Sequence, residues 1–197
     1  VGNPDLKPEV VRSWDLIWLG QWSDSAFSMG YFENHFDDAI VEIQTETPGL
    51  QMVENIDQEP TKGLELEVSS QLGSDWLIRV SYTNIIDKPE LSFREADQLF
   101  SFSANYKKGA WNANLIATWS NEREIPAVDD NLNRIALDDN WLLNAKLSYS
   151  FSSAMSGSLQ VKNLSNKNYH TPVASNLLTA GVPNRGREIL LGMTWQF

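Results

Sequence analysis

The sequence of 197 residues predicts an all-β protein, an antiparallel up-and-down sheet that crosses a membrane as part of a β-barrel. Three observations predict this fold class. Apolar residues alternate with small or polar ones in repeated segments, which is typical of strands whose two faces meet different media. Aromatic residues gather at the ends of these segments, where amphipathic rings settle at a lipid–water boundary. Short polar turns alternate with long polar connections, as they do in outer-membrane barrels.

The alternation begins near the N-terminus and recurs through the first half of the chain. A tilted strand needs roughly 9–11 residues to cross a membrane, and each segment supplies about that length. The apolar members are Trp14, Leu16, Trp18 and Trp22, a weaker set at Phe27, Met29 and Tyr31, then Leu64, Leu66, Val68 and Leu72, and finally Trp76, Ile78, Val80 and Tyr82.

The second half of the chain repeats the pattern up to the last residue. Its apolar sets are Phe100 to Tyr106, Trp111 to Trp119 and Trp141 to Phe151 in steps of two, a weaker pair at Leu159 and Val161, and Ile189 to Phe197 in steps of two. The last set stops on the aromatic Phe197, on its apolar face. Together the segments predict nine strands in up-and-down order.

The connections between these strands fall into two kinds. Short turns are expected at 23–25, 73–75, 108–109 and 152–156, where turn-forming residues cluster. Long polar connections are expected at 44–58, 84–97, 121–138 and 165–186, and such loops are the ligand-facing elements of a barrel. Nine strands in an open sheet would leave two unpaired edges in hydrocarbon, so the sequence predicts a piece of a larger barrel.

Composition narrows the classes of function. A net charge of −11 offers no basic patch for phosphates and argues against a nucleic-acid partner. The absence of cysteine from the sequence excludes a disulfide framework and a thiolate metal site. The acidic pairs Asp129-Asp130 and Asp138-Asp139 are interpreted as solvated loops rather than as a cation site, so we expect no metal and no cofactor.

An enzyme is not expected either. The two histidines, His35 and His170, are far apart in the sequence, and no nucleophile or metal-binding motif accompanies them.

Four short motifs occur in the order known from one protein family. The chain resembles the TonB-dependent outer-membrane receptors in an Asn-Pro-x-Leu-x-Pro-Glu segment, an Asn…Gly-x-Glu strand that starts at Asn55, a Val-x-Asn-Leu-x-Asp-Lys-x-Tyr motif and a Pro-Gly-Arg entry to the final strand. It departs from the family at Asn166, where Asp is usual, and it carries extra residues before Gly186. The matching positions are Asn3, Pro4, Leu6, Pro8 and Glu9, then Gly63 and Glu65, then Asn163, Leu164 and Tyr169, then Gly186 and Arg187, and the terminal Phe197.

The resemblance implies a 22-stranded barrel in the outer membrane of a Gram-negative bacterium. Residues 1–197 would be the C-terminal portion of its transmembrane β-barrel domain, strands 14 to 22, with the plug domain and the N-terminal strands absent from this chain. The implied function is energised uptake of a scarce nutrient, most of all a ferric siderophore or similar metal chelate, without covalent chemistry. The implied partners are outer-membrane lipid, the TonB system through the missing N-terminal region, assembly machinery that recognises the C-terminal strand, and a small-molecule nutrient. The alternative is a plug-less, substrate-specific porin for passive diffusion.

Candidate ligand contacts lie in the long loops, where a cation could pair with an anionic siderophore. They are Arg123, Arg134, His170 and Arg185. For the motif positions we expect structural roles instead. Pro4 and Pro8 would hold the chain extended, Gly63 would allow close backbone approach, and Asn163 would bond neighbouring backbone at a strand end.

Overall fold

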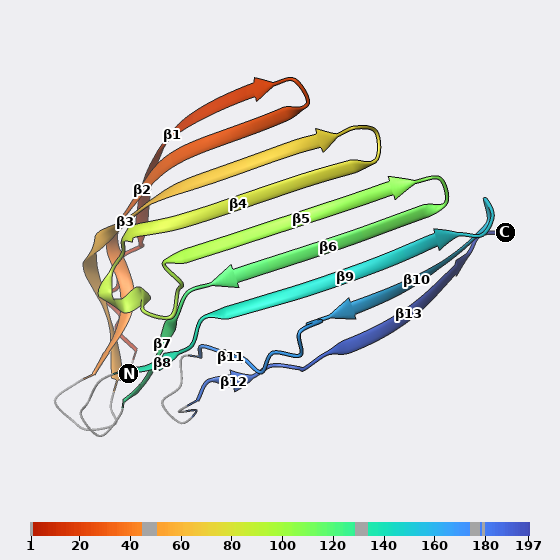
Figure 1. The fold of residues 1–197 in the computed structure, drawn as a ribbon. Helices are drawn as coiled ribbons and strands as arrows, with labels where there is room; N and C mark the ends of the chain where they lie inside the picture. The colour runs from red at the N-terminus through yellow and green to blue at the C-terminus, as the bar shows by residue number, and fades with distance from the viewer. Residues whose placement is uncertain (1, 45–50, 129–133, 174–177, 179) are drawn as a thin grey trace.

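The computed structural model describes residues 2–44, 51–128, 134–173, 178 and 180–197. Nine antiparallel strands form one sheet, and neighbours in the chain are neighbours in the sheet (Figure 1). The sheet contains β1 (Val10–Trp22), β2 (Ser25–Gln44), β3 (Gln51–Leu72), β4 (Trp76–Asp87), β5 (Gln98–Lys108), β6 (Trp111–Ser120), β9 (Asn140–Ser150), β10 (Met155–Lys162) and β13 (Glu188–Trp195). The predicted fold class and the nine up-and-down strands are confirmed.

Small elements occupy three of the connections between these strands. The 3₁₀ turn η1 (Glu90–Ser92) lies between β4 and β5. Two two-stranded hairpins pair β7 (Arg123–Val128) with β8 (Arg134–Leu137), and β11 (His170–Thr171) with β12 (Val182–Pro183). Across the described part of the chain, no helix has the length and apolar character needed to span a membrane.

The register of the sheet aligns the predicted apolar stripes with one another. Directly opposed residues of an antiparallel pair lie on the same face, so the register shows which side chains share a face. Phe102 is opposite both Val80 and Ala117, and Leu159 is opposite both Leu147 and Leu191. The stripes of these strands therefore form one continuous apolar face.

Polar residues line up in the same way on the other face. Ser81 is opposite Glu67 on one side and Ser101 on the other, and Ser101 is opposite Thr118. This face, called the polar face below, carries hydroxyls and charges across β3 to β6. The alternation seen in the sequence is therefore a difference between two sides of a single sheet.

The sheet is curved, and its two ends differ (Figure 1). Tight turns join the strands at one end, called the tight-turn end, and the C-terminus lies there. Longer connections, with the β7–β8 and β11–β12 hairpins, lie at the opposite end, called the long-loop end, close to the N-terminus. This arrangement gathers the predicted loop candidates on one side of the molecule.

Aromatic pairs lie near both ends of the sheet. Near the tight-turn end the ring centroids of Trp76 and Tyr106 are 4.7 Å apart. Nearer the long-loop end Trp14 packs against Tyr31 at 5.2 Å, and Trp119 against Trp141 at 6.0 Å. The rings thus form two bands, one toward each end of the strands, as amphipathic rings at two interfaces would.

The predicted long connections are partly wrong. Residues 51–58, expected in a loop, belong to β3, because their backbone pairs with β2 from Ile56 opposite Ala39 to Met52 opposite Ile43. Likewise Asn84–Asp87 belong to β4, and the 121–138 connection contains β7 and β8. These strands extend beyond the apolar stripes, so hydrophobic alternation does not reveal them.

Little of the described chain is buried, because the sheet is one layer thick. Ile125 of β7 is fully buried under the long-loop connections, whereas Leu191 of β13 is 84% exposed. Large apolar side chains on the apolar face are open along most strands. Such a face requires an apolar environment, which a bilayer provides.

Candidate ligand-binding surface

The N-terminal motif docks on the β2–β3 hairpin at the long-loop end. The Asn55 side chain joins the two, because its Oδ1 accepts from the Lys7 backbone N–H at 2.8 Å and its Nδ2 donates to the backbone oxygens of Lys7 and Asp38 at 3.0 and 2.6 Å. Asn3 donates to the Val53 backbone oxygen at 3.1 Å. The Ile40 N–H donates to the Glu9 carboxylate at 3.2 Å. Two of the sequence motifs thus meet, and their polar side chains bind backbone.

Gly63 lies where β3 passes under an aromatic ring. A Cβ at this position would lie 2.4 Å from the Phe32 ring and 2.8 Å from the Asn84 backbone oxygen. Glu65, two residues on, shares the polar face with Gly30 and Thr83, which are opposite it. The close approach expected at Gly63 is therefore present.

The third motif forms a corner between β10 and the β11–β12 hairpin. Asn163 is 5% exposed and has a left-handed backbone, with φ at 49°. Its Oδ1 accepts from the Lys167 N–H at 2.9 Å and its Nδ2 donates to the Lys167 oxygen at 2.8 Å. Leu164 donates through its N–H to the Leu143 oxygen. These contacts support the structural role expected of Asn163.

The same corner fixes the entry to the final strand. Asn166, at the position where the sequence departs from the family motif, accepts from the Arg187 N–H at 2.9 Å. A Cβ on Gly186 would come within 2.9 Å of that amide oxygen. The Asn184 N–H donates to the Tyr169 oxygen at 3.0 Å. Asn166 thus supplies a side-chain acceptor at the position where the motif usually has Asp.

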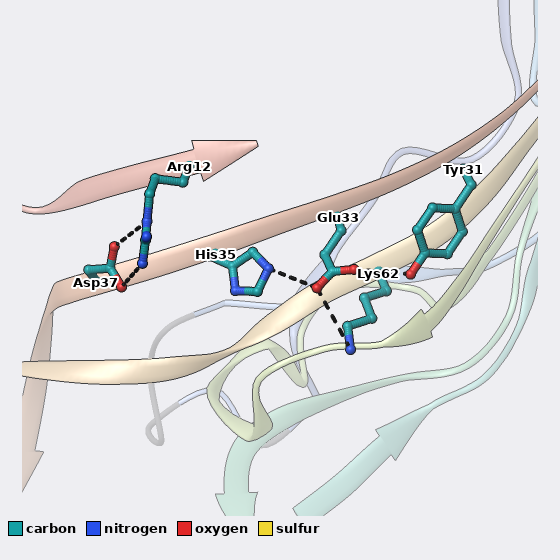
Figure 2. A network of polar contacts seen from close by, with 6 residues as sticks. All are labelled: Arg12, Tyr31, Glu33, His35, Asp37 and Lys62. Carbon is teal, nitrogen blue, oxygen red and sulfur yellow. Dashed lines mark hydrogen bonds and ion pairs between the residues drawn. The ribbon is translucent and has the colours of Figure 1, made fainter. Parts of the chain in front are cut away.

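A polar network lies on the same face as Trp14, along β2 beyond Tyr31 (Figure 2). Glu33, with a side chain 15% exposed, is opposite Trp14 on β1 and Lys62 on β3. Its carboxylate lies 2.7 Å from His35 Nε2 and 3.9 Å from Lys62 Nζ, and it accepts from the Tyr31 hydroxyl at 3.2 Å.

A second pair extends this network toward β1 (Figure 2). Arg12 donates to both carboxylate oxygens of Asp37, each at 2.8 Å, a bidentate geometry. Each carboxylate of the network thus meets a cation of the same chain, so the network joins three strands rather than offering a site for an ion. Sequence analysis missed it, although the polar residues Glu33, His35 and Asp37 at alternate positions after Tyr31 were a usable signal.

The structure places two of the four loop candidates in ion pairs. Arg134 lies 4.1 Å above the Phe93 ring, 3.1 Å from Glu90 and 3.6 Å from Glu124, and so ties the η1 connection to the β7–β8 hairpin. Arg185 is 86% exposed in its side chain and donates to Glu188 at 2.8 Å. This hydrogen bond raises the pKa of Arg185 above its ordinary value.

His170 and Arg123 line two hollows at the long-loop end. The hollow beside His170, about 240 Å³, also contains Asp138 and Asp139. No cluster of three or more metal-ligating side chains is found among the residues described, and Asp129 and Asp130 lie outside them. Tyr169 borders both hollows and so brings the two candidates into one neighbourhood.

The hollow beside Arg123, called the Arg123 hollow below, measures about 390 Å³. Its lining combines polar and apolar side chains. The polar ones include Ser81, Ser101, Thr118, Arg123, Asn140 and Tyr169, and the apolar ones are Leu99, Phe100, Trp119 and Leu142. Burial lowers the pKa of the Arg123 guanidinium. Cavities of this size accommodate small molecules. Asn140 is a member that sequence analysis did not single out.

A one-layer antiparallel sheet with one apolar face, one polar face and two aromatic bands defines a section of outer-membrane β-barrel wall. The family model described as "TonB dependent receptor-like, beta-barrel" matches residues 1–164. The chain therefore belongs to the TonB-dependent receptor family, whose members are located in the outer membrane of Gram-negative bacteria.

Individual relatives agree with this assignment. The chain is 23% identical to the ferripyoverdine receptor of Pseudomonas aeruginosa, over 99% of this chain and 26% of the receptor, and 25% identical to the vitamin B12 transporter BtuB of Vibrio vulnificus, over 88% and 28%. It superimposes on the pyoverdine outer membrane receptor FpvA of P. aeruginosa PAO1 bound to pyoverdine with a TM-score of 0.80 and 21% identity, over 98% of this chain and 30% of that one. The chain thus spans about a quarter of the length of its curated relatives.

Proposed function

We propose that the complete protein takes up a ferric siderophore, or a similar metal chelate, across the outer membrane in an energised, TonB-dependent step. The observation that carries this proposal is the match of the family's barrel model to residues 1–164. Two relatives support the choice of cargo by analogy, since both the P. aeruginosa and the P. putida proteins are named as receptors for ferric pyoverdine. The vitamin B12 transporter among the relatives shows that cargo differs within the family.

The proposal assigns residues 1–197 to the C-terminal portion of the barrel. A plug domain and further strands would complete the protein, and the TonB system would act through the N-terminal region. The apolar face would contact outer-membrane lipid, and assembly machinery would recognise β13 with the terminal Phe197. No covalent chemistry is part of this function, because its work is binding and transport.

Within the chain, we propose that residues at the long-loop end contact the ligand. Arg123 and His170 border hollows, whereas Arg134 holds two connections together through its carboxylate and ring contacts. Arg185 is highly exposed and is available to an anion beside its Glu188 partner.

Uptake of a radioactive ferric chelate by cells that carry the full-length gene tests this function. We expect saturable uptake that stops when TonB is deleted or the proton gradient is collapsed. A plug-less, substrate-specific porin would continue to admit the chelate under both conditions. Uptake that is independent of TonB would therefore overturn the energised mechanism and favour the porin.

A further inference from the structure

The two faces of the nine-stranded sheet differ in how their positive charges are satisfied. On the side of the apolar face, each Lys or Arg of the strands is paired with a carboxylate; they are Arg12, Lys62 and Lys108. On the polar face, no Lys or Arg of the strands forms an ion pair within the described part of the chain; they are Arg79, Lys107, Lys146 and Lys162. In a barrel whose apolar face meets lipid, the polar face lines the interior, so these cations are left for something inside the barrel.

Acidic residues are missing from the strands that carry most of these cations. The strands β5, β6, β9 and β10 contain no Asp or Glu, although the net charge of the chain is −11. Glu188 of β13 is opposite Lys162 but is bound by Arg185 at 2.8 Å. The polar face of these four strands, called the cationic wall below, therefore offers its lysines no carboxylate.

The opposite charge lies on the first three strands. Asp15 of β1 and Glu65 and Glu67 of β3 lie on the polar face, and none of the three is in an ion pair among the residues that the structure describes. The basic residues of these strands, Arg12 and Lys62, belong to the other side of the sheet. The polar face of β1 to β3 is called the acidic wall below.

A chain of three side-chain amides lies on the cationic wall. Asn105 Nδ2 donates to Asn114 Oδ1, and Asn114 Nδ2 donates to Asn112 Oδ1. Asn112 is opposite Lys107, and Asn114 is opposite Lys146. Asn105 Oδ1 and Asn112 Nδ2 have no hydrogen-bond partner within the described residues. The chain thus offers an acceptor at one end and a donor at the other, which is what a peptide group can bind.

A partner that meets both walls has to be large. Neighbouring strands lie about 4.8 Å apart, so Glu67 on β3 and Lys146 on β9 are about 19 Å apart along the sheet. Asp15 on β1 and Lys146 are about 29 Å apart by the same measure. A small-molecule site of about 300–1,000 Å³ is only about 7–10 Å across. A polypeptide domain can therefore contact both walls, whereas a chelate cannot.

We propose that the polar face docks a polypeptide domain inside the barrel, which places acidic side chains on the cationic wall and basic side chains on the acidic wall. The inference rests on the proposed function, which assigns a plug domain to the complete protein. It goes further by stating which strands meet which charge, so that the two walls together select one orientation of the domain. The Arg123 hollow lies farther toward the long-loop end, so cargo and domain contact different levels of the sheet.

Ion conductance of the purified full-length receptor in planar bilayers tests this docking. A docked domain blocks the barrel, so opening of the channel as urea is raised reports release of the domain. The double variant Lys107→Gln, Lys146→Gln is expected to raise the open fraction at a fixed urea concentration about five- to tenfold, which is the contribution of two exposed ion pairs. The double variant Glu65→Gln, Glu67→Gln is expected to raise it by a similar factor.

Lys108→Gln is the matched control for Lys107→Gln. It changes the next residue of the same strand, which points to the apolar face and pairs with Asp75, so the open fraction should stay unchanged. Lys107→Arg with Lys146→Arg keeps both charges and should behave as wild type. Lys146→Gln alone serves as the test if the double variant does not assemble, with a rise of about two- to threefold. Equal opening in the glutamine variants of Lys107, Lys146 and Lys108 would overturn the proposal.

Two further outcomes distinguish this inference from its alternatives. If the cationic wall holds only a small anion, the Glu65→Gln, Glu67→Gln variant will open as wild type does, which would refute docking of a domain. A receptor that conducts ions without urea would contradict both this inference and the energised mechanism. Failure of TonB-dependent uptake in a receptor that stays closed would contradict the proposed function alone and leave the docking result standing.

Discussion

At the tight-turn end the chain reverses within a few residues, with glycines such as Gly73 and Gly109 at φ values of 61° and 56°. At the long-loop end, by contrast, asparagine side chains bind backbone groups from distant parts of the sequence. Asn55 reaches a residue 48 positions away, and Asn166 one 21 positions away. The structure of the tight-turn end depends on residues that favour local turns. The structure of the long-loop end depends on single asparagine side chains, which form hydrogen bonds with backbone groups that lack a backbone partner.

The largest loss of stability is expected from Asn163→Ala at the long-loop end. The change leaves both backbone groups of Lys167 without their side-chain partner and puts alanine at a φ of 49°. We expect the free energy of unfolding of the full-length receptor to fall by about 2–4 kcal/mol. Urea titration in lipid vesicles measures it, and tryptic cleavage after Lys167 should become faster.

Asn163→Gly separates the loss of the side-chain hydrogen bonds to Lys167 from the strain of the left-handed backbone. Glycine tolerates the left-handed backbone, so this variant should lose about 1 kcal/mol less than the alanine variant, while its loop is cut just as readily. Equal losses in the two variants would show that backbone strain contributes nothing at this corner.

A smaller effect is expected from Gly63→Ala within β3. The new methyl group would meet the Phe32 ring and the Asn84 oxygen, and we expect a loss of about 1–3 kcal/mol. Phe32→Leu in the same chain should recover only part of it, because the Asn84 contact remains. Gly30→Ala on the neighbouring strand is the control, since its nearest neighbour would be 3.7 Å away. A similar loss at both glycines would contradict this explanation.

The smallest effect is expected at the tight-turn end, from Asp75→Asn. The hydrogen bond from Ser74, and after it the one from Lys108, lowers the pKa of the Asp75 carboxyl, so the ionised form stabilises the folded turn. This contribution is present above the unfolded-state pKa, near 3.8, and is lost as pH falls through the lower folded-state pKa.

The measurement is the difference in urea midpoint between wild type and Asp75→Asn as a function of pH. The difference should be small at pH 7 and vanish under acid conditions. A difference that persists below the folded-state pKa would mean that the carboxylate charge is not its source.

The sequence predicted the membrane strands well because their physics is local and periodic. Leu64, Leu66 and Val68 are alternate residues, so they lie on one face of any strand that contains them, and the register confirms this placement. Where the strands leave the apolar region, as β3 does at residues 51–58, that signal ends while backbone pairing continues. The ends of the strands in this region depend on backbone pairing with a neighbouring strand, which the hydrophobic periodicity of the sequence does not indicate.

The candidate surface was predicted less completely. Loop position alone pointed to Arg123 and Arg134, and only the packing shows that one borders a hollow while the other is bound by Glu90 and Phe93. Asn140 follows an acidic pair and begins a strand, so its sequence context suggests nothing more than a loop end. Its burial beside the hollow is a property of the folded chain that this sequence context does not encode.

The bonds of Asn55 also imply an order of events during folding. Asn55 accepts from Lys7 while donating to Asp38 within the β2–β3 hairpin. The docked segment ends next to Val10 of β1, which pairs with Asp37 of β2, so docking adds little loop-closure cost once β1, β2 and β3 are paired. The docking surface exists once the hairpin has formed. The segment before β1 therefore settles late, and its protection from hydrogen exchange would report that the hairpin beneath it is complete.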